Sequence, residues 1–124
     1  MRSLLFVPAD SGPKLDKAMA SGADAVIIDL EDSIVPERKP QARAACLEYL
    51  KSAQPKANRP RLFVRINGLD TGMTDADLEA IVAGKPDGVL FPKAEGGASL
   101  VHLDAKLTAR EAIAGLPEGA IKVL

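Results

Sequence analysis

Three carboxylates are crowded into four residues directly after an apolar run. Asp29 and Glu31 are alternate residues, so we expect their side chains to point the same way, with Asp32 beside them. Like charges this close raise one another's proton affinity unless a cation compensates. Such a cluster is suited to proton transfer or to holding the water shell of a divalent metal. The alternative is structural: the acids cap the following helix and pair with Arg38 or Arg43. We favour the functional interpretation.

A second candidate cluster begins inside another apolar run. Arg65 lies between Val64 and Ile66, on a β-prone backbone, and its planar fork of donors fits a carboxylate in two parallel hydrogen bonds. The anion is either Asp29 or Glu31, in a purely structural ion pair, or a substrate, and we favour a substrate. Asn67 is equally suited to a turn and to a substrate contact. Lys93, after a further apolar run, would neutralise the acids or face a substrate anion.

Short apolar runs alternate with longer helical patterns along the chain. The runs that predict strands are 4–7, 25–28, 62–66, 88–91 and 121–124. Helical spacing follows Pro13, Pro40, Thr74 and the region around Leu100, with Thr74 and Asp77 as the expected cap of the third helix. Apolar strands separated by helices predict a parallel sheet. The candidate side chains follow strand ends, so we expect them to meet at one edge.

Two α/β architectures agree with this pattern. A doubly wound sheet of five strands would be complete at about the length of this chain, 124 residues. A (β/α)₈ barrel needs roughly 250 residues, so the chain would supply about half of one. Length and composition alone favour the doubly wound sheet. In both architectures the chemistry lies at the carboxyl ends of the strands.

Composition narrows the class of protein. Sixteen basic and seventeen acidic residues leave a net charge of −1, which gives no reason to expect nucleic acid as a partner. The longest apolar run near the start is too short for a membrane span or a signal peptide. A single cysteine, Cys46, is typical of a reducing compartment. These features predict a cytoplasmic protein with no membrane partner.

Several segments, taken in order along the chain, resemble one family. They are SLLFVP at 3–8, SGADAVIIDLEDS at 21–33 with Pro36 and Lys39 behind it, VRINGLDT at 64–71, and FPK at 91–93. Together they resemble the citrate lyase β-subunit-like family, within the HpcH/HpaI aldolases. This broad group of CoA-ester carbon–carbon lyases includes malyl-CoA and citramalyl-CoA lyases, and it is related to metal-dependent 2-oxo-acid aldolases.

The resemblance implies a TIM barrel and reverses the length-based preference. Residues 1–124 would then be a partial barrel domain, truncated at its C-terminal end, with about four βα units and the start of strand five. The implied function is Mg²⁺-dependent cleavage of a citryl-, malyl- or citramalyl-CoA ester into an acyl-CoA and a 2-oxo acid. Two alternatives remain: a non-catalytic 2-oxo-acid or CoA-ester binding or assembly protein, and a 2-oxo-acid aldolase that does not use CoA.

The resemblance also implies roles for particular residues. Arg65 would grip the carboxylate of the oxo acid. Glu31 and Asp32 look like the acidic pair beside the metal-bound water, with Asp29 in support. Phe6 resembles the aromatic residue of the substrate pocket.

Lys17 resembles the lysine that meets the CoA phosphates, although a helical lysine is usually solvated. Ser11 stands about where many relatives have an arginine, a place that Lys14 would have to fill. The two acidic metal ligands of the family follow strands five and six. We therefore expect no metal ligand in this chain and the first-shell acids beyond Leu124. Relatives are commonly trimers or hexamers, which implies a homo-oligomer.

Overall fold

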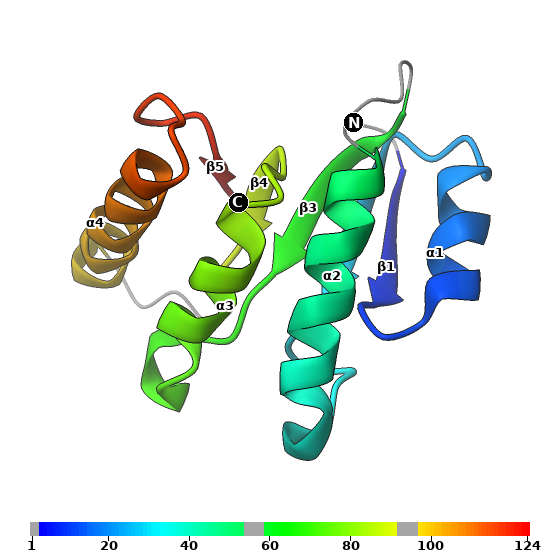
Figure 1. Cartoon of the computed structure of the whole chain (residues 1–124), viewed down its shortest axis with the longest axis horizontal. Coiled ribbons are helices and arrows are strands. Elements are labelled where there is room, and N and C mark those ends of the chain that lie inside the picture. Colours follow the sequence, from blue (N-terminus) through cyan, green and yellow to red (C-terminus); the bar gives the residue numbers. More distant parts are fainter. Residues whose placement is uncertain (1–2, 54–58, 92–96) are drawn as a thin grey trace.

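The computed structural model describes residues 3–53, 59–91 and 97–124 as five strands and four helices, joined partly by short 3₁₀ turns (Figure 1). The elements are β1 (Leu4–Pro8), α1 (Gly12–Met19), β2 (Ala25–Asp29), η1 (Pro36–Arg38), α2 (Lys39–Ala53), β3 (Arg61–Arg65), η2 (Leu69–Thr71), α3 (Thr74–Val82), β4 (Gly88–Leu90), α4 (Gly97–Ile113) and β5 (Lys122–Val123). Every predicted strand is present, and no end is shifted by more than one residue. No helix in these described ranges is long and apolar enough to cross a membrane.

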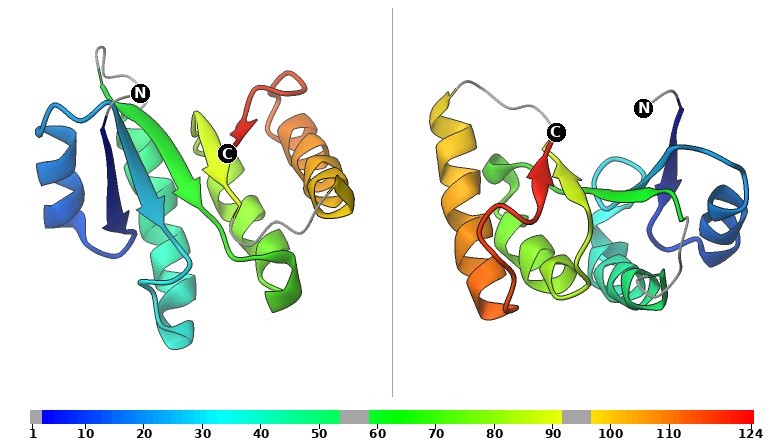
Figure 2. Two further views of the ribbon diagram at one scale, coloured as in Figure 1. Left: turned by 180° about the vertical axis from the view of Figure 1, so that it is seen from behind. Right: turned by 90° about the horizontal axis from the view of Figure 1, so that it is seen from above.

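The strands form one parallel sheet in the order β1-β2-β3-β4-β5. Helices α1 to α4 follow one another along the outside of this curved sheet (Figure 2). A doubly wound sheet reverses its strand order and carries helices on both faces, whereas a barrel adds each strand beside the last and keeps its helices outside. The chain is therefore a partial (β/α)₈ barrel. The barrel prediction is confirmed, and the preference for a doubly wound sheet is wrong.

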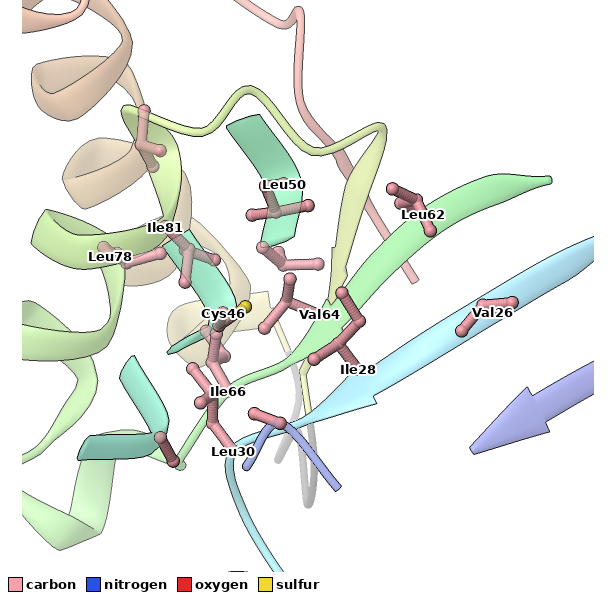
Figure 3. Packing of buried hydrophobic residues seen from close by; sticks show 14 of the residues in the cluster. Val26, Ile28, Leu30, Cys46, Leu50, Leu62, Val64, Ile66, Leu78 and Ile81 are labelled. Atoms are coloured by element: carbon pink, nitrogen blue, oxygen red, sulfur yellow. The ribbon is translucent and has the colours of Figure 1, made fainter. Parts of the chain in front are cut away.

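Alternation along the strands divides the buried residues into two clusters. Val26 and Ile28 point toward the helices and join the larger cluster, in which side chains of α2 and α3 such as Cys46 and Ile81 pack against the sheet (Figure 3). Ala25 and Ile27 point to the inner face, where they pack with Phe63 and Leu90. Because β2 is buried on both faces, it is apolar almost throughout, as a central barrel strand must be.

The strand register brings the polar ends together. Pro8, Asp29 and Arg65 are aligned as Cα partners across β1, β2 and β3. Residues that are directly opposite in a parallel ladder point to the same face. Asp29 and Arg65 therefore face one another on the inner side, at the carboxyl end of the sheet.

The predicted cap of α3 is wrong. The residue before this helix is Met73, and no side chain caps its amino end. Thr74 instead donates its hydroxyl to the carbonyl of Asn67 at 3.0 Å, and Asp77 is fully buried. Both side chains belong to a network that joins α3 to the end of β3.

Candidate functional site

Asp29 and Arg65 form a two-point ion pair at the carboxyl end of the sheet. The guanidinium donates from Nε to Oδ1 at 2.8 Å and from Nη2 to Oδ2 at 2.7 Å. The carboxylate also accepts the backbone N–H groups of Glu31 at 2.8 Å and Ser33 at 3.0 Å. Only 2% of the Asp29 side chain is exposed. The aspartate is thus saturated with donors and ties the loop after β2 to the end of β3.

These hydrogen bonds determine the charge state of the pair. Burial alone raises the pKa of Asp29, but the hydrogen bonds from Arg65 and from the segment containing Glu31 and Ser33 outweigh it and hold this pKa well below its usual range. Hydrogen bonding to Asp29 likewise raises the pKa of Arg65. Both groups are charged at neutral pH. Asp29 is therefore suited to orienting Arg65 rather than to exchanging a proton.

One edge of the Arg65 guanidinium is not used by Asp29. Arginine has five N–H donors, and Asp29 uses one on Nε and one on Nη2. The remaining Nη1 and Nη2 donors form a second fork, for which the described residues provide no hydrogen-bond partner. The ring of Phe6 covers one face of the guanidinium, with its centroid 4.9 Å from Cζ. The side chain is 23% exposed, so part of it is in contact with solvent.

The other two acids lie beside this arginine. Glu31 Oε1 is 3.6 Å from Arg65 Nε, and its side chain is 17% exposed. Asp32 is exposed, and its charge also helps to raise the pKa of Arg65, after the larger effect of Asp29. One structural alternative had these acids pairing with Arg38 or Arg43, but those arginines pair with Asp10 and Asp77 respectively. The other alternative, an internal ion pair of Arg65 with Asp29 or Glu31, is present.

Asn67 is committed to the interior. Its side-chain oxygen accepts from Lys39 Nζ at 2.9 Å, and its amide nitrogen donates to the Leu30 carbonyl at 3.1 Å and to Asp77 Oδ2 at 2.7 Å. Only 2% of Asn67 is exposed. This arrangement gives no support to a substrate contact, because both amide protons are used and the oxygen is covered.

Sequence reasoning gave the two charged partners of Asn67 no place in the site: Asp77 was expected to cap a helix, and Lys39 appeared only in the family resemblance. Lys39 is 6% exposed and Asp77 is fully buried, and Arg43 Nε donates to Asp77 at 2.7 Å. Two sequence signals would have identified these residues as buried. Lys39 directly precedes the proline that opens a helix, and Asp77 lies on the apolar face of a helix.

One predicted substrate contact, Lys17, is not brought to this site. Lys17 is exposed on α1 and, with Lys14, lines a groove of about 280 Å³ along β1. Phe6 lines the same groove, so the groove and the Arg65 cluster meet at this ring. Lys93 lies outside the described residues.

The acids do not by themselves form a metal centre. Within the described ranges, no group of three or more His, Cys, Asp or Glu side chains could hold a metal ion. Asp29 is unsuited as a ligand because its oxygens already accept four hydrogen bonds. Carboxylates of Glu31 and Asp32 have the oxygen chemistry that Mg²⁺ prefers, but further ligands are required.

Several curated proteins are similar to this chain in sequence. A (3S)-malyl-CoA thioesterase of Cereibacter sphaeroides is 40% identical over 99 residues, covering 80% of this chain and 34% of the relative. An L-malyl-CoA/beta-methylmalyl-CoA lyase of the same species is 38% identical over 117 residues, covering 92% and 36%. The chain thus spans about a third of the length of these curated relatives.

Solved structures show the same fold. Protein CitE from Mycobacterium tuberculosis, in complex with magnesium, acetoacetate and coenzyme A, aligns with a TM-score of 0.68 at 38% identity, covering 89% of this chain and 41% of that one. Haloferax volcanii malate synthase aligns with a TM-score of 0.82 at 17% identity, covering 98% and 40%, a likeness of fold alone. The family model described as HpcH/HpaI aldolase/citrate lyase matches residues 2–124. The chain belongs to the HpcH/HpaI aldolase/citrate lyase family.

Proposed function

We propose that this chain carries the oxo-acid half of the active site of a carbon–carbon lyase that cleaves a citryl-, malyl- or citramalyl-CoA ester. The observation that supports this most is the Arg65 guanidinium. Asp29 fixes it by one edge, while its other edge has no hydrogen-bond partner among residues 3–53, 59–91 and 97–124. An arginine pre-oriented in this way loses little freedom when it binds a carboxylate, so its second fork is suited to one.

In this proposal Arg65 binds the carboxylate of the 2-oxo-acid portion through Nη1 and Nη2. Asp29 keeps the guanidinium charged and in place, and Phe6 covers its face. The groove beside β1, with Lys14 and Lys17, takes the phosphates of CoA. The thioester would then approach from the β1 side and pass the Phe6 ring.

Cleavage requires removal of one proton and breakage of one carbon–carbon bond. Glu31 or Asp32 takes the proton of the substrate hydroxyl, and the electron pair of the broken bond leaves as a thioester enolate. The hydroxyl carbon becomes the carbonyl of the 2-oxo acid, and the enolate takes up a proton to give the acyl-CoA. Mg²⁺, held with additional acids, would supply a Lewis acid for the oxo-acid oxygens. Arg65 and Asp29 contribute orientation and charge.

Thioester hydrolysis is the second candidate, because a relative that is 40% identical bears the name of a malyl-CoA thioesterase. Hydrolysis consumes water and releases a free CoA thiol with the hydroxy acid intact. Lyase cleavage releases a 2-oxo acid and leaves the thioester on the acyl product. The two reactions therefore give products that can be distinguished in one incubation.

The test is to incubate the full-length protein that contains this chain with (3S)-malyl-CoA and Mg²⁺ and to measure glyoxylate as its phenylhydrazone and free thiol with a disulfide reagent. We expect glyoxylate without thiol, and loss of glyoxylate in Arg65→Lys but not in the matched Arg61→Lys, which changes an exposed arginine at the other end of the same strand. Thiol without glyoxylate would establish hydrolysis instead. If neither product forms but added glyoxylate binds in a separate titration, the result would indicate a binding protein. Pyruvate released from a CoA-free 4-hydroxy-2-oxo acid would indicate an aldolase.

A further inference from the structure

We infer that Lys39 is a positioning residue that fixes the backbone bearing Glu31, an inference that rests on the function proposed above. Its ammonium donates to the carbonyls of Leu30 and Glu31 and to Asn67 Oδ1, each at 2.9 Å. An ammonium has three protons, so all of them are used. Lys39 is 6% exposed and therefore acts inside the protein, beneath the loop that carries Glu31 and Asp32, here called the acidic loop.

The Leu30–Glu31 backbone is hydrogen-bonded at each of its four polar groups. Leu30 N–H donates to the Arg65 carbonyl at 3.0 Å, and Glu31 N–H donates to Asp29 at 2.8 Å. The Leu30 carbonyl accepts from Lys39 and from Asn67. The Glu31 carbonyl accepts from Lys39 and, over a longer 3.3 Å, from the N–H of Ile34. Without Lys39, the Glu31 carbonyl would keep only that longer bond.

The charge of Lys39 has no structural counterpart in this network. Asp77 pairs with Arg43 at 2.7 Å, so the one carboxylate of the network is already matched. The three atoms that Lys39 contacts are neutral oxygens. A buried charge is costly unless something compensates it, and neutral donors would satisfy the same oxygens at a smaller cost. The role that explains a buried ammonium here is to fix the position of the acidic loop.

Lys39 and Arg65 act on different parts of the site. Arg65 is held by two side-chain bonds from Asp29 that do not involve Lys39. Removing the ammonium should therefore displace Glu31 and Asp32 while the anion-binding edge of Arg65 stays in place. The expected signature is a fall in kcat with little change in the affinity for glyoxylate.

The first test measures amide hydrogen exchange in Lys39→Met and Lys39→Gln, with Lys51→Met as the control. Lys51→Met makes the same change at an exposed lysine of the same helix and leaves the three bonds of Lys39 in place. Exchange at Glu31 is compared with exchange at Val64, which reports on the central strand. We expect the Glu31 amide to exchange about tenfold faster relative to Val64 in Lys39→Met, less so in Lys39→Gln, and within about threefold of wild type in Lys51→Met. Unchanged Glu31 exchange in both Lys39 variants would overturn the inference, as would an equal effect of Lys51→Met.

The second test compares turnover of malyl-CoA and affinity for glyoxylate in the same variants. Lys39→Met should lower kcat by about tenfold or more and change the glyoxylate Kd by less than about threefold, a split that general unfolding would not produce. Faster Glu31 exchange with unchanged kcat would remove the catalytic part of the inference. If the full-length wild-type protein shows no turnover, the proposed function fails, and the exchange result still decides whether Lys39 fixes the loop.

Discussion

The substitution Arg65→Lys separates the binding role of this residue from its structural role. Arg65 reaches Asp29 with one edge and offers the other edge to a substrate. Lysine keeps the positive charge but presents a single point, so it cannot serve Asp29 and a substrate carboxylate with two bonds each. Arg65→Ala is less informative. It would leave Asp29, which is 2% exposed, as an uncompensated buried charge, and removing one partner of a buried pair costs about 3–5 kcal/mol.

The expected loss of affinity follows from the bonds that are lost. A hydrogen bond to a charged group contributes about 1.5–3 kcal/mol, so loss of one arm of the fork should weaken glyoxylate or pyruvate binding about 10- to 150-fold. Calorimetric titration measures this change. Urea unfolding of the same variant should show a smaller loss of stability, about 1–2 kcal/mol, because lysine still donates to Asp29.

Arg61→Lys is the matched control, since it makes the same change on the same strand at the opposite end of the sheet. It should leave the affinity for glyoxylate unaltered. Equal affinity of wild type and Arg65→Lys would refute the assignment of the free guanidinium edge to the oxo acid.

Three further substitutions or measurements test the structure around the site. The folded-state pKa of Asp29 lies below the ordinary value of about 3.9, so its ionised form stabilises the fold above that pH, and this contribution is lost as pH falls through the folded pKa. Asp29→Asn should therefore be less stable than wild type at pH 7, and its free energy of unfolding should fall less between pH 5 and pH 3. Urea unfolding at several pH values measures this, and an equal fall in the variant and in wild type would contradict it. Burial raises the pKa of the Cys46 thiol to about 12, and the charge of Asp77 adds a smaller contribution. A disulfide reagent should therefore label Cys46 only as fast as the protein unfolds. Rapid labelling of the native chain would be inconsistent with the buried position. A Cβ at Gly88 would lie 2.7 Å from the carbonyl oxygen of Lys122 and from the Phe63 ring, so Gly88→Ala should lower the free energy of unfolding by about 1–3 kcal/mol. Gly12 has open space around it, so Gly12→Ala should change that free energy by less than about 0.5 kcal/mol. Equal thermal midpoints of the two variants would show that the packing around Gly88 is looser than described.

The elements of the fold could be predicted from local patterns, but the architecture could not. Runs such as Ala25–Ile28 identify strands because both faces are buried, and all five strands appear where they were expected. Strand order depends on which edge each new strand joins, and hydropathy does not record that choice. The resemblance of whole segments supplied the barrel, which the consecutive strand order confirms.

The candidate site was predicted in part for a related reason. Strand ends indicated that Asp29 and Arg65 would share one rim, and their pairing was the alternative that we did not favour. It depends on the β2–β3 register, which no local pattern determines. Asn67 was predicted as a turn residue or a ligand, and it is instead buried against Lys39 and Asp77. Such networks join residues far apart in the chain, so sequence spacing carries little information about them.

Side-chain NMR of Arg65 during a glyoxylate titration tests the central claim most directly. If the free edge receives the carboxylate, the Nη resonances should shift with added glyoxylate, while the Nε–H bonded to Asp29 remains protected and nearly unmoved. A shift at Nε that accompanies release of Asp29, or no response at Arg65 while glyoxylate binds elsewhere, would contradict the account.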